Sequence, residues 1–211
     1  QGLSINEGIA VDARLVKSAS KPLRNDELKK HRDKRNSPEG KLDKNGKPLK
    51  FSRDLQSDWT VKNDLPHYGL KEHSSVDTNH GFVLATIMTP ASVNDTNYLP
   101  YCTVYSRHTK QSIEKAYADK GYAGKPNRDF LALNNIDDGI MRKDSTTAKL
   151  TEYEKDRNKK ISKVRYIVEQ YFGLSHLHDG AKRARFTDIT KNKFDVWYRQ
   201  AAFNISRGSP H

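Results

Sequence analysis

The pattern of apolar and polar positions along the chain predicts a mixed β-sheet of about five strands flanked by helices, an α/β arrangement. Five stretches have the short apolar runs or the alternation typical of strands: Gly8–Val16, Tyr68–Asp77, Phe82–Met88, Ser112–Tyr117 and Asp138–Arg142. A turn at residues 79–81 joins the second and third into a hairpin, so these two strands should run antiparallel. We expect the strand that ends before Asp119 to run parallel to Gly8–Val16.

Four stretches have the spacing of helices: from Asn94 or Asp95 to Tyr105, Asn127–Asn134, Thr151–Ser175 and Asp188–Ser206. The apolar stripe of the longest helix consists of Ile161, Val164, Val168, Tyr171 and Phe172. The last helix carries a similar stripe, which we expect to be its buried face: Phe194, Trp197, Tyr198, Ala201 and Ile205.

Residues 18–60 interrupt this pattern, and we interpret them as a basic insertion within a single domain that spans residues 1–211. Between Lys21 and Lys50 there are eleven Lys or Arg and five Asp or Glu residues, which is half of the formal net charge of +12. Turn residues are frequent and apolar periodicity is almost absent, so we expect a poorly packed loop. It is either a solvated charged loop or a contact surface for phosphates. The candidate phosphate contacts are Lys29, Lys30, Arg32, Lys34 and Arg35, with a second basic cluster at Lys182, Arg183 and Arg185.

The composition points to a polyanionic partner. The sequence pI is about 9.6, the mean hydropathy is −0.92 and 34% of the residues are hydrophobic. A strongly positive chain favours nucleic acid as its partner. No apolar run approaches the roughly 18 residues that span a bilayer, and no signal peptide is visible, so we expect no membrane partner. The single cysteine, Cys102, excludes a disulfide within the chain and suits a cytoplasmic protein.

Three acidic residues stand where a metal ion could be held. Asp12 lies within an apolar strand, where an unpaired charge is costly to bury, and Asp119 follows a strand just before Gly121 breaks it. Glu169 lies four residues after Arg165 on the longest helix, so both side chains project from one face. Taken alone, each has an ordinary interpretation: a buried ion pair or a strand-end turn for Asp12, a turn for Asp119, and a surface ion pair for Arg165 and Glu169.

Taken together, carboxylates on two neighbouring strands and one packing helix can converge on a pair of hard cations. Mg²⁺ prefers oxygen ligands and keeps several waters, so three carboxylates and a phosphate suffice. Two such ions, about 3.5–4 Å apart, stabilise the attacking and leaving oxygens of an in-line phosphoryl transfer. The pattern therefore predicts two Mg²⁺ ions, with Mn²⁺ as a substitute.

Four strings resemble the catalytic domain of bacterial insertion-sequence transposases, the DDE enzymes, which are named for two aspartates and a glutamate. The strings are VDA at 11–13, YGLKEH at 68–73, ADKGY at 118–122 and RYIVEQYFG at 165–173. The resemblance covers about residues 5–207 and implies a ribonuclease-H-like fold, with Asp12, Asp119 and Glu169 as the catalytic and metal-binding triad. It also implies DNA strand cleavage and strand transfer, with water and then a 3′-hydroxyl as the nucleophile.

Some positions depart from the family pattern. Ser162 stands where relatives often have Tyr, and His176 stands where they have Lys, so His176 becomes a candidate phosphate contact beside Arg165. Relatives usually carry a helical DNA-binding region before the first aspartate, whereas eleven residues precede Asp12 here. We therefore expect a truncated product or an expressed catalytic fragment that lacks this region.

The resemblance implies DNA as the partner, both transposon ends and target, and allows a homodimer on that DNA in the bacterial nucleoid. Two alternatives remain open at this point. A related metal-dependent nuclease would use the same triad for hydrolysis alone, and an inactive remnant would only bind DNA.

Overall fold

A six-stranded mixed sheet forms the centre of the computed structural model, which describes residues 8–37, 45–47, 54–109, 112–145, 148–178 and 180–209. The strands are β1 (Ile9–Lys17), β2 (Asp58–Lys62), β3 (Leu65–Asp77), β4 (Val83–Pro90), β5 (Lys115–Ala118) and β6 (Asp137–Ile140). The α-helices are α1 (Asn25–Asn36), α2 (Leu99–Thr109), α3 (Lys125–Leu133), α4 (Glu152–His178) and α5 (Ile189–Gly208). Two short 3-10 helices, η2 (Asp95–Tyr98) and η3 (Lys120–Tyr122), precede α2 and α3.

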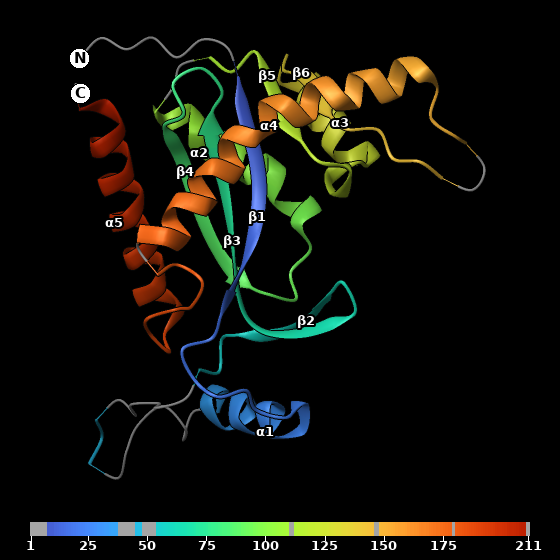
Figure 1. The fold of residues 1–211 in the computed structure, drawn as a ribbon. Helices are drawn as coiled ribbons and strands as arrows, with labels where there is room; N and C mark the ends of the chain where they lie inside the picture. The colour runs from blue at the N-terminus through green and yellow to red at the C-terminus, as the bar shows by residue number, and fades with distance from the viewer. Residues whose placement is uncertain are drawn as a thin grey trace.

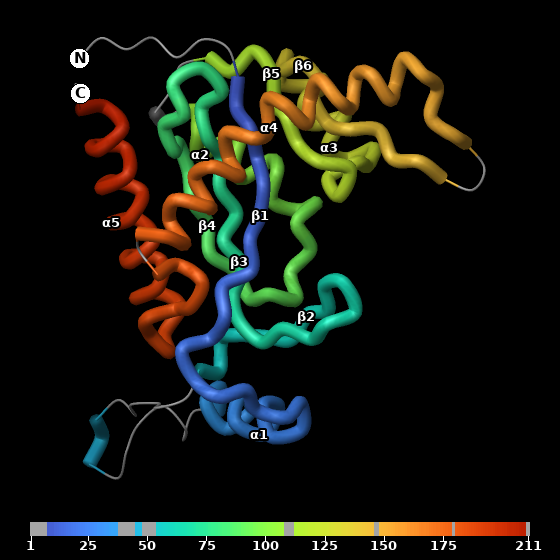
Figure 2. The backbone as a smooth tube through the Cα atoms, in the orientation of Figure 1, coloured from blue at the N-terminus to red at the C-terminus, as the bar shows by residue number. Residues whose placement is uncertain are grey.

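The strand order is β2-β3-β1-β5-β6, and β4 pairs with the second half of β3 (Figures 1 and 2). β3 runs antiparallel to both β1 and β4, whereas β5 runs parallel to β1 and to β6. Both predicted strand relationships are therefore confirmed: the hairpin is antiparallel, and the strand before Asp119 is parallel to the first strand.

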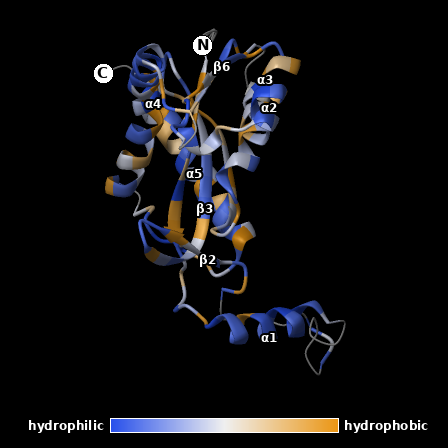
Figure 3. Ribbon diagram, turned by 90° about the vertical axis from the view of Figure 1, so that its right-hand side faces the viewer, coloured by the Kyte–Doolittle hydropathy of each residue, from blue (hydrophilic) through white to orange (hydrophobic). Residues whose placement is uncertain are grey.

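Helices cover both faces of the sheet, with α4 on one side and α2 and α3 on the other (Figure 3). Alternate residues of β1 divide between these two layers because successive side chains of a strand point to opposite faces. Ile9 and Val11 pack with Leu99 and Cys102 of α2, while Ala10 packs with Val168 on the α4 side. Asp12 shares the face of Ala10, so it points toward α4.

The apolar stripe of α5 is not its buried face, contrary to the sequence prediction. Phe194, Trp197, Tyr198 and Ile205 are 57–72% exposed, and Ala201 is half-buried. α5 instead lies along β4 with polar side chains turned inward, because the backbone of the edge strand needs hydrogen-bond partners. The amide of Val83 donates to Asn204 Oδ1 (2.8 Å), and its carbonyl accepts from the side-chain amides of Asn204 and Gln200.

Part of the basic segment is a helix, where the sequence predicted a loop. Residues 25–36 form the α1 helix, which stands away from the sheet (Figure 1), whereas residues 38–44 and 48–53 lie outside the described part of the chain. Leu28 of α1 is 2% exposed and packs with Leu23, Leu55 and Tyr68. Leu28 is the only residue of α1 that is buried, so the sequence of the helix has little apolar periodicity and the helix was not predicted.

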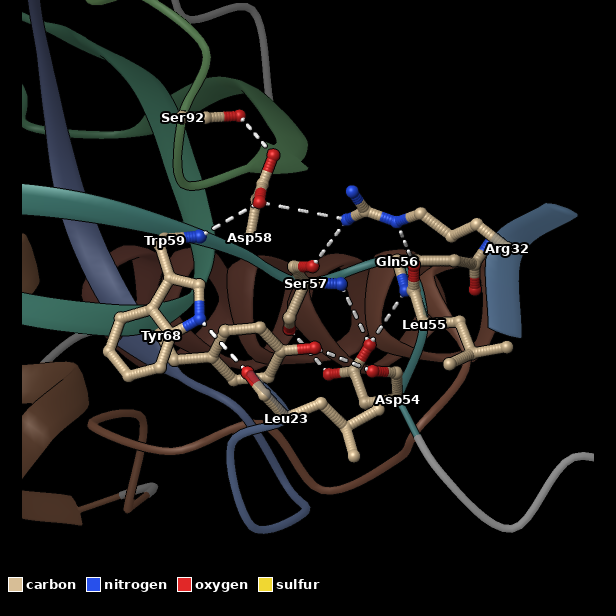
Figure 4. A network of polar contacts seen from close by, with 10 residues as sticks. All are labelled: Leu23, Arg32, Asp54, Leu55, Gln56, Ser57, Asp58, Trp59, Tyr68 and Ser92. Atoms are coloured by element: carbon tan, nitrogen blue, oxygen red, sulfur yellow. Dashed lines mark hydrogen bonds and ion pairs between the residues drawn. The ribbon is translucent and has the colours of Figure 1, made fainter. Parts of the chain in front are cut away.

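A polar network anchors α1 to the chain before β2 (Figure 4). Arg32 donates to the carbonyls of Leu55 (3.0 Å) and Ser57 (2.8 Å) and lies 3.7 Å from a carboxylate oxygen of Asp58. The buried Asp54 accepts from the backbone amides of residues 56 and 57, which closes the turn that Arg32 contacts. Arg32 therefore has a structural role here, and its predicted contact with phosphate stays a prediction.

A buried histidine gives the fold a defined pH response. His73 in β3 is fully buried and stacks on Tyr98 at 4.4 Å. Its Nε2 lies 2.9 Å from Thr89 Oγ1, which itself donates to the Pro90 carbonyl, so the ring is neutral with the proton on Nε2. Burial lowers the pKa of His73 from 6.5 to about 4, with Asp95 raising it and Lys71 lowering it further.

We expect this histidine to destabilise the fold in acid. Between pH 6.5 and about 4, His73 takes up a proton in the unfolded chain but stays neutral in the folded state. The stability that depends on the neutral ring is therefore complete above pH 6.5 and is lost as the pH falls. At pH 5 the loss should be about 2 kcal/mol. Urea unfolding at pH 7.5 and pH 5 of the parent protein and of His73→Gln measures it. Equal losses of unfolding free energy in the two proteins would contradict the assignment.

No helix among the described residues is long and apolar enough to cross a membrane.

Candidate active site

The pairing of β1 with β5 brings two of the candidate carboxylates together. Ile9 pairs with Ala116 and Ala10 with Tyr117 in parallel register. The same register, continued by two residues, places Asp12 beside Asp119, where β5 has just ended. Side chains at the carboxyl ends of parallel strands face the crevice in which α/β proteins bind ligands.

A tight turn fixes the Asp119 carboxylate. Asp119 is the N-terminal cap of η3, and its Oδ1 accepts from the amide of Gly121 at 2.7 Å. A β-carbon at position 121 would lie 2.8 Å from that same oxygen, so only glycine allows the carboxylate to fold back this closely. The turn chemistry proposed for Asp119 from the sequence is therefore present, and it orients the side chain at the strand end.

Asp12 is held from the helix layer. Its Oδ1 accepts from the amide of Ala13 at 2.8 Å, and its Oδ2 accepts from Nη2 of Arg165 at 2.7 Å. The Arg165 side chain is 8% exposed and that of Asp12 is 21% exposed. The alternative of a surface ion pair between Arg165 and Glu169 is wrong, because Arg165 turns into the protein toward Asp12.

Glu169 approaches the same place from α4, which crosses the sheet over β1 (Figure 1). It lies one helical turn after Arg165 and is exposed. The pKa of Asp12 is raised, chiefly by burial. Arg165 and the Ala13 amide oppose this increase in pKa, and Asp119 and Glu169 add to it. Both acidic residues thus act on Asp12 through their charge, as carboxylates in one neighbourhood do.

A second buried ion pair sets the position of α4 over β1, and the sequence analysis missed it. Glu72 is fully buried and accepts from Arg14 at 2.7 and 3.0 Å, and from the Tyr171 hydroxyl at 3.0 Å. Arg14 also donates to the Phe172 carbonyl at 3.1 Å. Residues from β1, β3 and α4 are joined in this way. The sequence did contain an indication of this pair, because Arg14 lies two residues after Asp12 and so on the same face of the strand.

Tyr122 is a further residue that sequence reasoning passed over. It is 1% exposed, and its hydroxyl has no hydrogen-bond partner among the described residues. Burial raises its pKa well above the ordinary value, and the charges of Asp12, Asp95 and Asp119 raise it further. The tyrosine belongs to the core cluster that includes Leu99 and Leu131, and the charges of Asp12 and Asp119 still reach its hydroxyl.

The remaining predicted contacts do not join this group. The charges that act on His176 are those of Arg14, Lys182 and Glu72, and burial followed by the two cations lowers its pKa, so it is neutral at pH 7. Arg183 donates to the Ser18 carbonyl at 3.0 Å, and Arg185 pairs with Asp195 at 3.2 Å. Lys182, Lys29, Lys30 and Lys34 are exposed, and Arg35 is half-buried.

In the described part of the chain, no three His, Cys, Asp or Glu side chains are gathered closely enough to hold a metal ion. The oxygen of Asp12 that points toward α4 is bound by Arg165 instead. The site thus has the right donor atoms on three elements, in an arrangement that is not closed around a cation.

Comparison with known protein families shows which family this chain belongs to. The family model described as "Transposase DDE domain" matches residues 5–205. This chain is a member of that transposase DDE family. A curated relative, "Transposase for insertion sequence element IS1106" from Neisseria meningitidis serogroup B, is 32% identical over 161 residues, which is 75% of this chain. Transposases of this family generally use divalent metal ions.

The fold agrees with this membership. The chain superposes on piggyBac transposase, solved as a synaptic complex with hairpin DNA, with a TM-score of 0.51, 9% identity and 96% of this chain covered. With the mixed sheet, this makes the DDE domain ribonuclease-H-like. The catalytic core domain of BIV integrase matches at 11% identity over 74% of this chain and 85% of that chain, with a TM-score of only 0.36. The chain spans about half the length of the two transposases it matches, 53% of the IS1106 transposase and 46% of the piggyBac chain.

Proposed function

We propose that this DDE domain is the catalytic domain of a DNA transposase that cleaves a DNA strand and transfers its end to a target, with Asp12, Asp119 and Glu169 as metal ligands. The observation that carries the proposal is the placement of Asp12 beside Asp119 on parallel strands, beneath the helix that bears Glu169. Burial is the main cause of the raised pKa of Asp12, and the charges of Asp119 and Glu169 add to it, which supports a common neighbourhood for the three carboxylates.

The donor set suits Mg²⁺, or Mn²⁺ in its place. Three carboxylates supply hard oxygen ligands and up to three negative charges, and phosphate oxygens with water can complete an octahedral shell. When bound, the metal would supply electrophilic stabilisation of the phosphate oxygens during in-line attack. The protein contributes orientation: the Gly121 amide aims Asp119, and the Ala13 amide aims Asp12.

DNA binding would involve the exposed face of α1. Lys29, Lys30 and Lys34 are exposed on a helix that stands off the sheet and is strongly hydrophilic (Figure 3). Lysines of this kind contact phosphates without reading sequence. The contact through Lys182 stays part of the proposal, since its side chain is also exposed.

Replacing Lys29, Lys30 and Lys34 together by Gln should weaken binding to any duplex. Each lost phosphate contact should reduce the slope of log affinity against log salt by about 0.9. Fluorescence anisotropy with two unrelated duplexes at four salt concentrations measures both quantities. The matched control replaces Lys149, Lys155 and Lys159, three exposed lysines near the N-terminal end of α4. It should leave the slope closer to that of the parent protein. An unchanged slope in the α1 variant would mean that these charges only solvate the helix.

The alternatives predict different products. A purified transposase domain incubated with Mg²⁺, a donor duplex and a labelled target should yield nicked donor and joined donor–target strands. A nuclease would give cleaved donor without joined product, and a binding remnant would shift the DNA without cutting it. EDTA should abolish both products. Joined strands would establish the proposed activity, and DNA binding without any metal-dependent cut would refute it.

A further inference from the structure

The two buried arginine–carboxylate pairs at the sheet–α4 interface differ in how completely they are satisfied. Arg14 donates twice to Glu72 and once to a backbone carbonyl, and it packs against the rings of Tyr171 and Phe172. Hydrogen bonds and ring contacts thus hold the Arg14 guanidinium in one position. Its role is to hold β1, β3 and α4 together.

Arg165 is held much less completely. Its Nη2 donates to Asp12 at 2.7 Å, its Nη1 makes only a long 4.0 Å contact with the sulfur of Met141, and its buried Nε has no hydrogen-bond partner among the described residues. Buried guanidinium donors are rarely left unpaired, because each loses its hydration. The guanidinium is thus fixed by one carboxylate, and that carboxylate lies at the partly open side of the interface.

Arg165 and a metal ion would compete for the same oxygen of Asp12, because both are cations. Oδ1 already accepts from the Ala13 amide, so the oxygen that Arg165 covers is the one free of backbone contacts in the described structure. Arginine does not lose its proton in proteins, so its charge stays in place as long as the side chain does. A divalent cation brought to this oxygen would meet that charge within a few ångströms in a poorly solvated site.

We infer that Arg165 is an exchangeable counter-ion: it holds the Asp12 carboxylate in the metal-free protein, and binding of a divalent cation displaces it. This inference rests on the proposed function, since it assigns Asp12 to the metal. It explains why the three carboxylates are neighbours and yet are not gathered around a cation in the described residues. Arg165 is accordingly a positioning residue, not a catalytic one.

The displaced guanidinium has a consequence for DNA binding. It lies one helical turn from Glu169 and, once released, would be a buried cation without a partner unless an anion enters the site. A phosphate group supplies that anion. Metal and phosphate should therefore bind with positive coupling, and the coupling must be equal in both directions.

The test uses Mn²⁺ as the probe and the unbound-ion signal in electron paramagnetic resonance as the readout, without DNA. Arg165→Gln removes the competing charge, so we expect it to bind Mn²⁺ at least about tenfold more tightly than the parent protein. Arg165→Lys keeps the charge and should not show this gain. Adding Asp12→Asn to Arg165→Gln should abolish the gain, because the gain depends on the freed oxygen.

A structural role of Arg165 gives the opposite pattern. If the ion pair merely fastens α4 to β1, Arg165→Gln should lower Tm and leave Mn²⁺ affinity unchanged or weaker, which would overturn the inference and leave the proposed function intact. If neither the parent protein nor Arg165→Gln shows Mn²⁺ binding that depends on Asp12, the metal assignment itself fails, and the proposed function fails with it.

A second measurement needs no change in the chain and covers the case in which Arg165→Gln does not fold. In parent protein labelled with ¹⁵N-arginine, the Nε–H signal of Arg165, assigned with Arg165→Lys, should move saturably as Mg²⁺ is added. The Arg14 signal should stay in place, because its partners are unaffected. An Arg165 signal that is unmoved at Mg²⁺ concentrations that occupy the site would overturn the exchange.

Discussion

Replacing Asp119 by Asn is expected to abolish metal-dependent strand cleavage while leaving the fold and DNA binding nearly unchanged. The side-chain oxygen of Asn can still accept the hydrogen bond from the Gly121 amide, so the turn that shapes η3 should persist. The lost negative charge weakens the proposed metal site, whose electrostatic stabilisation is worth several kcal/mol. A loss of about 4 kcal/mol corresponds to roughly a thousandfold lower rate.

Single-turnover cleavage of an end-labelled duplex in Mg²⁺ measures this effect. Asp129→Asn is the matched control, since Asp129 is exposed on α3 and the substitution removes the same charge. Its rate should equal that of the parent protein. If Asp119→Asn also cleaves at the parent rate, these carboxylates are not the catalytic centre.

The second large effect concerns stability. Glu72→Ala should destabilise the domain by about 3–5 kcal/mol, because it leaves the Arg14 guanidinium buried without its carboxylate. The Tyr171 hydroxyl, which donates to the same carboxylate, would lose its partner as well. Because the network joins β1, β3 and α4, a weakened pair should also loosen the helix that carries Arg165 and Glu169.

Urea unfolding at pH 7 measures the loss, and Glu152→Ala provides the control. Glu152 is 89% exposed and, among the described residues, pairs with Lys155 on the surface, so its loss should change the unfolding free energy by less than about 0.5 kcal/mol. A double variant with Arg14→Met and Glu72→Leu should recover part of the stability, because it removes both charges together. If Glu72→Ala unfolds at the urea concentration of the parent, the ion pair does not hold α4 in place.

The strands and long helices were predictable because their patterns are strong over many residues. The turn between the hairpin strands, the alternation in β3 and the apolar run of β4 predicted the antiparallel pairing, and the apolar stripe of α4 predicted its buried face correctly. The positions of Asp12 and Asp119 followed from the same reasoning, since an acidic residue inside one strand and another at a strand end stand out against apolar neighbours.

The errors arose where tertiary contacts override local pattern. α5 exposes Phe194, Trp197 and Tyr198. Its face toward β4 instead carries Gln200 and Asn204, which bond the backbone of Val83 at the edge of the sheet. α1 has almost no apolar stripe and is held by one leucine and one arginine. Likewise, the spacing of Arg165 and Glu169 suggested a pair on the helix surface, whereas the buried Asp12 across the interface is the stronger partner.

The central claim is that Asp12, Asp119 and Glu169 are ligands of one divalent metal centre. Anomalous scattering from crystals of the parent protein soaked in Mn²⁺ tests it most directly. We expect a Mn²⁺ peak within about 2.1 Å of carboxylate oxygens of both Asp12 and Asp119, the usual distance for Mg²⁺-type sites, with Arg165 moved off Asp12. A Mn²⁺ peak elsewhere in the domain, with Arg165 still bound to Asp12 and none between the two aspartates, would contradict it.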